Sequence, residues 1–206
     1  PLIRFGMSAP SNLTTYRSGA FGEEYRGNIF ISHFNTRTVT RSRLKRDGST
    51  FRADIEPFLV STNPDFHPCD VIEDADGSLL VINTGGWFKI GCPTSSLQPQ
   101  VLGGIYRVHR KDHKSPSDPR GLKIDWKNET TAQLASRLGD KRFAVRDRAM
   151  TVLTKRGIET IGVFLEGTAT IGTIWTLSRI GTPSALAAVR SALDHTEPSV
   201  RLVAAT

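Results

Sequence analysis

The sequence contains little cysteine and no long apolar run. Only two of its 206 residues are cysteines, Cys69 and Cys92, and they form no Cys-x-x-Cys pair. Because a tetrahedral zinc site needs four ligands, two separated cysteines do not indicate zinc, and we assign no metal ligands. The absence of any stretch of about 18 apolar residues excludes a transmembrane helix. The Cys-x-x-Cys-His motif that attaches haem covalently is also missing.

Basic residues outnumber acidic ones, but the excess of basic residues is spread over both parts of the chain. The net charge is +7, of which +3 falls before Trp126 and +4 after Asp125. Residues 37–46 are densely basic, and their alternation predicts a strand with one solvated face. Aromatic residues, which would stack on the bases of a single strand, do not interleave with these charges, so we expect no nucleic-acid partner. The basic residues on this predicted face are Arg37, Arg41, Arg43 and Lys45.

Residues 66–106 contain the clearest β-hairpin signal in the chain. Apolar segments at residues 71–72 and 79–82 flank Asp76-Gly77. Asp-Gly between β-prone segments predicts a tight turn in which both residues adopt positive φ. A second Asp-Gly pair, at residues 47–48, lies between strand-like segments in the same way. The first part of the chain therefore indicates two copies of one β unit.

The two units differ in the number of predicted strands. The first has strands at residues 12–17, 28–32, 36–44 and 51–60, and the second, beginning at Cys69, has residues 79–82 and 104–108 as its next two. Two segments, residues 29–31 and 79–82, are apolar at both odd and even positions, so both faces of the sheets are expected to be buried. Stacked sheets in units of about 40 to 50 residues are typical of a β-propeller, so residues 1–110 are predicted to be its C-terminal blades. The missing fourth strand is expected from blades upstream of Pro1.

The predicted topology assigns each loop to one of the two ends of the sheets. Both Asp-Gly turns fall at one end, while the loops at residues 33–36 and 83–99 and the crossover at 62–68 fall at the other. Polar residues converge at this second end, and we interpret them as candidates for the rim of a cofactor or substrate site. A hydrogen-bonding or packing role for each is the alternative, and no catalytic residue is identified. The candidates are His33, Asn35, His67, Asp70, Asn83 and Trp87.

The two cysteines bracket the predicted hairpin. Cys69 lies at its entry and Cys92 lies in the loop beyond its second strand. A disulfide between them would close this loop, contribute about 3 kcal/mol by the loop-entropy estimate and point to an oxidising compartment. The sequence leaves open whether this bond forms.

The apolar periodicity becomes helical after residues 111–129, a charged and proline-containing segment that we predict to be a linker. A Thr-x-x-Gln sequence at residue 130 predicts a capping box, and glycines and prolines stand where helices are expected to end and begin. Short antiparallel helices joined by tight turns over residues 130–206 favour an incomplete α-solenoid, with a generic helical bundle as the alternative. The apolar positions on the predicted buried faces are Val145, Ala149, Val152, Leu153, Ile158, Ile161, Leu165, Ile171, Ile174, Leu177, Leu186, Val189 and Leu193.

Two segments of the helical part have similar sequences. Residues 140–146, from an Asp to an Arg, correspond to residues 194–201, and each segment is followed by an alanine, at Ala149 or Ala204. The pattern resembles HEAT repeats, in which an Asp before a helix and an Arg within it bridge neighbouring repeats. The two copies differ by one residue in spacing.

The order of motifs along the chain resembles the junction of planctomycete-type "membrane-bound dehydrogenase" proteins. In these proteins a β-propeller of the glucose/sorbosone dehydrogenase class is followed by HEAT repeats. The resemblance covers nearly the whole first part of the chain. The matching stretches are residues 9–13 (APSNL), 16–17 (YR), 24–28 (EYRGN), 66–71 (FHPCDV), 76–77 (DG), 84–87 (TGGW), 91–93 (GCP) and 103–107 (GGIYR).

This resemblance implies a periplasmic or otherwise extracytoplasmic protein that oxidises a sugar or alcohol. It implies pyrroloquinoline quinone and calcium as cofactors of the full-length protein and a cytochrome c as a partner. The catalytic histidine of that class comes from an earlier blade, so this chain would supply only rim contacts. The alternative is a non-catalytic subunit, whose propeller and helical repeats dock protein partners in a larger complex.

Overall fold

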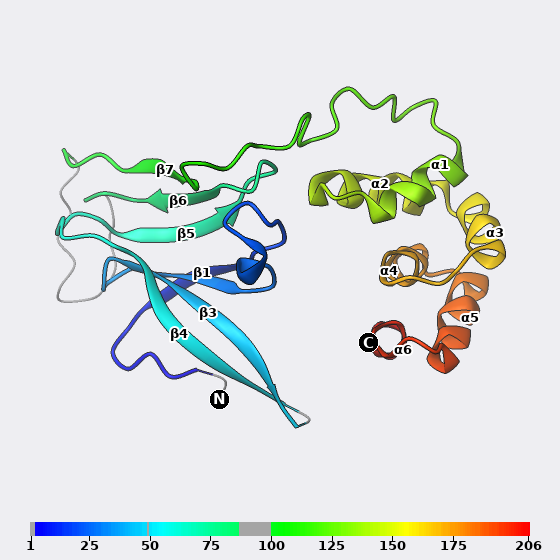
Figure 1. Cartoon of the computed structure of the whole chain (residues 1–206), viewed down its shortest axis with the longest axis horizontal. Helices are drawn as coiled ribbons and strands as arrows, with labels where there is room; N and C mark the ends of the chain where they lie inside the picture. The colour runs from blue at the N-terminus through cyan, green and yellow to red at the C-terminus, as the bar shows by residue number, and fades with distance from the viewer. Residues whose placement is uncertain (1–2, 49, 87–99) are drawn as a thin grey trace. The chain divides into compact units, whose positions relative to one another are not determined.

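The computed structural model of the chain describes residues 3–48, 50–86 and 100–206. The chain divides into two compact units, Pro1–Ser115 and Pro116–Thr206. This boundary lies inside the segment 111–129 that the sequence predicts to be a linker. The first unit contains the described β-strands and the second contains the described α-helices (Figure 1). The fold is therefore a mixed one, with two antiparallel sheets and six α-helices in the described part of the chain.

The first sheet is formed by four consecutive antiparallel strands in the spatial order β1-β2-β3-β4. The loop between the first two strands contains a short 3-10 turn, Glu23–Tyr25. Four strands were predicted for this segment, and all four are confirmed. Their bounds are Pro10–Thr15 for β1, Ile29–His33 for β2, Thr38–Asp47 for β3 and Thr50–Val60 for β4.

The second sheet has three described strands, β5 (Pro68–Glu73), β6 (Leu79–Asn83) and β7 (Gly104–Val108), in the order β5-β6-β7. Its first strand lies beside the first strand of the other sheet (Figure 1). Ser11 Oγ donates a hydrogen bond to the Pro68 carbonyl oxygen at 2.9 Å. The two sheets are thus joined through the strand with which each one begins.

One apolar core fills the space between the two sheets. Tyr16 is fully buried, and its hydroxyl donates to the Gly77 carbonyl oxygen at 2.6 Å while accepting from the Phe21 backbone N–H at 3.1 Å. Burial raises the pKa of this phenol. The buried apolar residues of the core are Tyr16, Ala20, Phe21, Phe30, Val39, Phe66, Val71, Leu79 and Val81.

The two Asp-Gly turns differ in one respect from the sequence-based expectation. Gly48 and Gly77 have positive φ, but Asp47 and Asp76 do not. The prediction that both turn residues adopt positive φ is wrong for the β5–β6 turn because that turn is longer than two residues. The Gly77 N–H donates to the Asp74 carbonyl oxygen at 2.8 Å, and Asp76 Oδ1 accepts from the Ser78 N–H at 2.9 Å.

Arg41 was expected on the solvated face of β3, and that expectation is wrong. Only 5% of this residue is exposed. Its guanidinium donates to Asn28 Oδ1 at 2.6 Å, to the Glu24 carbonyl oxygen at 2.7 Å and to Glu56 Oε1 at 3.0 Å. It also lies 3.6 Å from the centroid of the Tyr25 ring. The loop before β2 covers this part of β3, so Arg41 lies in a fully hydrogen-bonded pocket.

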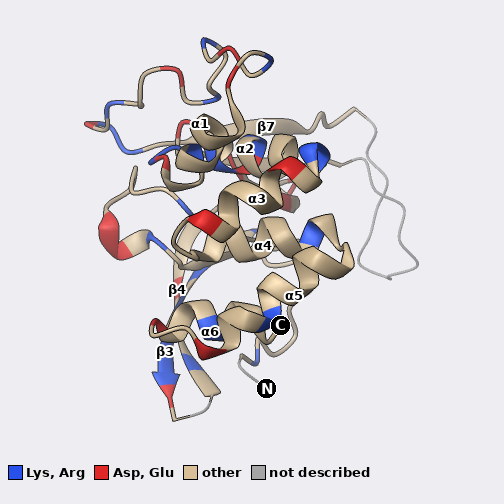
Figure 2. Cartoon of the chain, turned by 90° about the vertical axis from the view of Figure 1, so that its right-hand side faces the viewer, with Lys and Arg blue, Asp and Glu red and all other residues tan. Residues whose placement is uncertain are grey.

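The prediction of one solvated face is wrong for residues 43–47 of β3, because both faces of the strand are exposed there. Arg43 and Lys45 are exposed, and they form ion pairs with Glu56 and Asp54 of the neighbouring strand β4. Arg37 lies in the turn before β3 with positive φ, outside the strand. Lys and Arg are interspersed with Asp and Glu along the chain (Figure 2).

The helical unit contains α1 (Thr131–Ser136), α2 (Phe143–Arg156), α3 (Ile158–Glu166), α4 (Ile171–Ile180), α5 (Pro183–Ser191) and α6 (Pro198–Ala204). Short 3-10 turns, Arg137–Gly139 and Ala192–Asp194, follow α1 and α5. The odd-numbered helices contact one another in sequence, and so do the even-numbered helices (Figure 1). The helices therefore form two layers of three. No helix of the described chain is long and apolar enough to cross a membrane, in agreement with the sequence.

The predicted helix ends are confirmed at several positions. Thr130 and Gln133 form the capping box of α1, and prolines stand in the first turn of α5 and α6. Gly157 and Gly181 follow α2 and α4 with positive φ. A second capping box, formed by Thr170 at the start of α4, was not predicted.

The helical core contains most but not all of the predicted apolar positions. Val145, Ala149 and Leu153 of α2 are fully buried. The prediction is wrong at the ends of the shorter helices, because the buried face of α3 is formed by Thr160, Ile161 and Phe164 instead. The predicted core residues that are exposed are Ile158, Leu165, Ile171 and Leu193.

The internal repeat is visible as two equivalent arginine contacts. An Nη of Arg146 donates to the carbonyl oxygens of Asp140 and Lys141 at 2.6 and 3.1 Å. An Nη of Arg201 donates to those of His195 and Thr196 at 2.7 and 2.9 Å. The partner of Asp140 in the second copy is therefore His195, not Asp194, which removes the one-residue difference in spacing.

His195 and Asp140 also make equivalent hydrogen bonds in their two turns. Asp140 Oδ1 accepts from the backbone N–H two residues later, at Arg142, at 2.8 Å. His195 Nδ1 accepts from the backbone N–H of Glu197 at 3.0 Å. Both side chains thus shape the turn that precedes an even-numbered helix.

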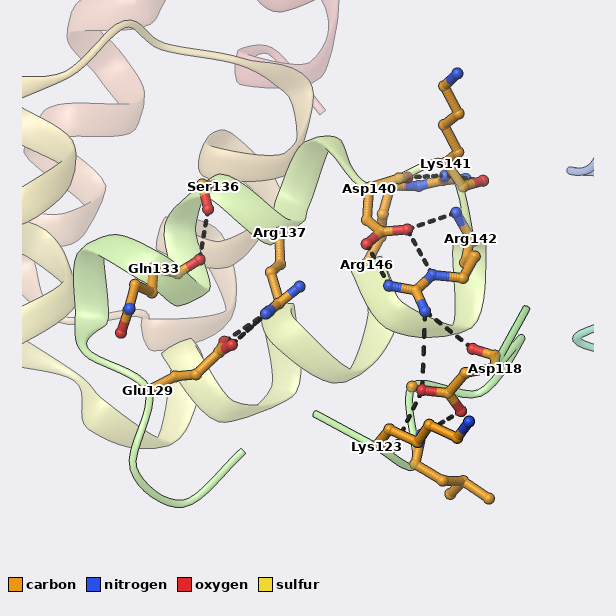
Figure 3. Close-up of polar contacts among 12 residues, drawn as sticks. Asp118, Lys123, Glu129, Gln133, Ser136, Arg137, Asp140, Lys141, Arg142 and Arg146 are labelled. Atoms are coloured by element: carbon orange, nitrogen blue, oxygen red, sulfur yellow. Dashed lines mark hydrogen bonds and ion pairs between the residues drawn. The ribbon is translucent and has the colours of Figure 1, made fainter. Parts of the chain in front are cut away.

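Ion pairs fix the start of the helical unit (Figure 3). Arg142 pairs with Asp140 at 2.8 Å and donates to the Asp118 carbonyl oxygen at 3.0 Å, and its guanidinium lowers the pKa of Asp140. Arg137 pairs with Glu129 and lowers the pKa of that carboxyl group. Trp126 is buried in the helical core. The second half of the predicted linker therefore packs on the helical unit.

We predict that Arg41→Met lowers the free energy of unfolding by about 3 kcal/mol, because it leaves Asn28, the Glu24 carbonyl group and Glu56 without their shared donor. The exposed Arg43→Met variant is the matched control and should cost less than about 1 kcal/mol. Urea unfolding followed by circular dichroism measures both. Equal losses in the two variants would contradict the structural role of Arg41.

Candidate functional site

The candidate residues lie where β2 and β6 end and β5 begins. His33 is the last residue of β2, Asn83 is the last residue of β6, and Pro68 of β5 pairs with Asn83. The β2–β3 loop and the crossover before β5 meet here, because the rings of Phe34 and His67 stack with centroids 4.9 Å apart. The structure thus brings loops from both sheets together at one end.

His33 is 2% exposed and lies between two hydroxyl groups. Ser8 Oγ is 2.7 Å from its Nδ1, and Thr40 Oγ1 is 2.8 Å from its Nε2. The Phe5 ring packs edge-on against the imidazole, with centroids 4.6 Å apart. Burial lowers the pKa of His33 below its usual value of 6.5. Both ring nitrogens are therefore engaged in hydrogen bonds within the fold.

Asn83 is buried and organises the backbone around it. Its Oδ1 accepts from the His67 N–H at 2.7 Å and from the Gly85 N–H at 3.0 Å. The Thr84 N–H in turn donates to the His67 carbonyl oxygen at 3.2 Å. Asn83 thus holds the crossover and the loop after β6 in register, and its carbonyl oxygen has two partners already.

Asn35 and His67 also contact neighbouring segments. Asn35 Oδ1 accepts from the Ala9 N–H at 2.8 Å, and its Nδ2 donates to the Met7 carbonyl oxygen at 3.0 Å. This amide therefore fixes the segment that leads into β1. The partly buried His67 has its Nδ1 3.4 Å from the Phe34 carbonyl oxygen.

Asp70 is the third residue of β5. Its Oδ1 accepts from Asn12 Nδ2 at 2.7 Å and from the Val71 backbone N–H at 2.7 Å. It therefore joins β5 to β1. The sixth candidate, Trp87, lies outside the described residues.

Among the described residues, Cys69 has no disulfide partner. Its Sγ donates to the Ile82 carbonyl oxygen at 3.5 Å, and burial raises the pKa of the thiol. Cys92 lies outside the described residues, so its pairing with Cys69 stays a prediction.

The described candidates do not by themselves provide the ligands of a calcium ion. Calcium takes six to eight oxygen ligands, whereas Asp70 is the only carboxylate among these candidates and its Oδ1 has two donors already. Within residues 3–48, 50–86 and 100–206, no group of three or more His, Cys, Asp or Glu residues is placed to hold a metal ion. What the arrangement does is hold the loops of two sheets in fixed positions.

Sequence reasoning missed the partners that make this network. Thr40 could have been found from the hairpin register: His33 pairs with Thr38, and Thr40 is the next residue of β3 on the same face. Ser8 and Asn12 carry no such signal, because their contacts join residues 25 and 58 positions apart.

We predict that His33 makes stability depend on pH. Because burial lowers the pKa of His33 in the folded chain, the unfolded chain takes up the proton first as the pH falls. Stability should therefore decrease below about pH 6.5, by at most about 1.4 kcal/mol per pH unit, and level off below the folded-state pKa.

Urea unfolding at several pH values between 7.5 and 4.5 tests this prediction. His33→Gln should remove this part of the pH dependence, while the exposed His109→Gln variant should keep it. Identical pH profiles for the wild type and His33→Gln would contradict the assignment.

One family match covers the first sheet and part of the second, but not the helices. Residues 5–89 match the model of a protein family described as a domain of unknown function, DUF7133. The matched segment includes the first sheet and the β5–β6 hairpin. No curated protein and no solved structure matches the chain.

Proposed function

We propose that this chain carries two neighbouring blades of a β-propeller followed by an α-solenoid of HEAT-like repeats. The observation that supports the propeller is the placement of β1 beside β5. In a propeller each blade starts with its innermost strand, so the first strands of consecutive blades are neighbours at the ring axis. The sequential order of both sheets, β1 to β4 and β5 to β7, agrees with this arrangement.

The two-layer packing of the helices supports the solenoid. Alternating helices stack in sequence, and the arginine contacts of Arg146 and Arg201 repeat with the same partners in the preceding turn. Repeats that contact only their neighbours extend one hydrophobic core along the stack. The outer edge of β7, with Ile105 and Tyr106 exposed, is where this proposal places a fourth strand from the upstream blades.

For the whole protein we propose a quinone-dependent sugar or alcohol dehydrogenase-like activity in an extracytoplasmic compartment, with cytochrome c as an electron acceptor. The resemblance of the motif order supports this proposal. When bound, pyrroloquinoline quinone would accept the electrons of the oxidised substrate. This chain's own part is structural: Asn83, His67 and Asn35 hold the loops at the rim, and Asp70 ties two blades together.

A non-catalytic interaction protein is the second candidate. The exposed apolar side chains of the helical unit favour it, because Ile158, Leu165 and Trp175 are 78%, 67% and 39% exposed. Ile158 and Leu165 are seven residues apart and lie on one face of α3, and contiguous exposed apolar surface is typical of sites that dock protein partners.

We predict that the full-length protein, supplied with pyrroloquinoline quinone and calcium, reduces a dye when sugars or alcohols are added. In that protein, Asp70→Ala should lower the melting temperature, because β1 and β5 lose a hydrogen bond, while kcat and KM stay within about twofold. Asn12→Ala removes the other partner of the same bond and is the matched variant.

A large rise in KM for Asp70→Ala, but not for Asn12→Ala, would show that Asp70 contacts the substrate and would contradict its structural role. Failure of the wild-type protein to bind the quinone or to reduce the dye with any sugar or alcohol would overturn the enzymatic proposal in favour of the interaction protein.

A further inference from the structure

A second polar cluster surrounds a cavity at the β5–β6 turn. This turn is at the end of β5 opposite to Pro68, and so opposite to the candidate site described above. The cavity has a volume of about 300 Å³, at the lower end of the range for small-molecule sites. We call it the turn pocket; it is lined by Ala20, Asp76, Gly77, Ser78, Arg107, His109, Arg110, Lys111, His113 and Ser115.

One wall of the turn pocket is a fixed polar network. Ser78 is 3% exposed, and its hydroxyl group donates to Asp76 Oδ1 and accepts from an Nη of Arg107. Arg107 also pairs with Asp74 at 2.9 Å and with Asp76 at 3.1 Å. The guanidinium of Arg107 is thereby oriented, and its charge is balanced by these carboxylates.

The other wall consists of basic residues that have no acidic partner. Within the described chain, Arg110, Lys111 and His113 form no ion pair, and Arg110 donates one hydrogen bond, to the Phe21 carbonyl oxygen at 3.2 Å. The His113 N–H donates to the Arg110 carbonyl oxygen at 3.1 Å, which folds the segment into a turn. The turn places these three side chains around the same cavity.

The charge balance of the turn pocket is therefore positive. Asp76 is its only acidic lining residue, and this carboxylate already pairs with Arg107. Guanidinium, ammonium, imidazole and hydroxyl groups are the donors that bind tetrahedral oxyanions, and an arginine can bind two oxygens of one such anion at once. The pocket contains no aromatic ring of Phe, Tyr or Trp on which a base could stack, so a single-stranded nucleic acid is a poor fit.

We propose that the turn pocket binds a phosphate or sulfate group, either free or carried by a small molecule. Arg110, Lys111 and His113 donate to the oxygens of the anion, and the Ser78–Arg107 wall closes the other side. This site does not depend on the proposed dehydrogenase-like function, because none of its residues belongs to the loop end that contains His33 and His67.

Titration of the ¹⁵N-labelled chain with sodium phosphate tests the proposal, with sodium chloride at matched ionic strength as the reference. We expect saturable shifts of the amide signals of Ser78, Lys111 and His113 with phosphate and not with chloride. A second titration, with glucose 6-phosphate, separates the two sources of the anion: affinity at least tenfold higher than for inorganic phosphate indicates a phosphorylated small molecule, and equal affinity indicates the free anion.

Two neighbouring lysines provide a matched pair of variants. Lys111 lines the turn pocket, whereas Lys114, three residues later and also exposed, does not. Lys111→Gln should raise the phosphate Kd at least fivefold, since it removes a charged donor, and Lys114→Gln should change it less than twofold. Circular dichroism checks that both variants are folded.

Three results would overturn the proposal. The first is a titration that does not saturate. The second is a set of amide shifts spread over the basic residues of the whole chain. The third is an equal loss of phosphate affinity in Lys111→Gln and Lys114→Gln. The second and third results would each show non-specific attraction of phosphate to the net positive charge of the chain.

Discussion

The hydrogen bonds between β1 and β5 are the contact on which the sheet unit depends. At one end of the pair, Ser11 and Asn12 bind the Pro68 carbonyl group and Asp70. At the other end, the Glu73 carboxylate accepts from the backbone N–H groups of Arg17 and Ser18 at 2.6 and 2.8 Å, and Tyr16 binds the carbonyl group of the β5–β6 turn. These bonds fix two separate sheets against one core, because the partners are nearly 60 residues apart and no backbone ladder joins them.

The loop end and the turn pocket both follow from this contact. Since β5 is held along its length, the crossover before it and the turn after it have fixed positions. At the crossover, Asn83 and His67 complete the loop end, and at the turn, Ser78 and Arg107 form a rigid wall. In the helical unit, Arg146 and Arg201 donate to carbonyl oxygens of the turn that precedes their helix.

Local features were predictable from the sequence because they depend on neighbouring residues. The strands, the Asp-Gly turns, the Thr130 capping box and the helix-starting prolines all belong to this class. Features set by distant partners were not predictable. Arg41 has the spacing of an exposed residue, yet a loop 13 to 17 residues before it in the chain makes it a core residue. His195 replaces Asp140 in the second repeat, which a search for aspartates could not show.

The candidate site shows the same division. Topology alone indicated that His33, Asn35, His67 and Asn83 approach one another, and the structure brings the loops that carry them together. Their hydrogen-bond partners, Ser8, Thr40 and the backbone groups of other loops, could not be deduced because sequence order does not specify side-chain contacts. A convergence of polar residues therefore indicated a junction of loops, and the contacts then showed what each residue does there.

A structure of the full-length protein, by crystallography or electron cryo-microscopy, tests the central claim most directly. Our account predicts that β1 and β5 are the innermost strands of adjacent blades, joined by the Asn12–Asp70 and Tyr16–Gly77 contacts. The edge of β1 that is not paired with β2, and the edge of β5 that is not paired with β6, should face a central channel. A further strand hydrogen-bonded to the free edge of β1 or of β5 would contradict it.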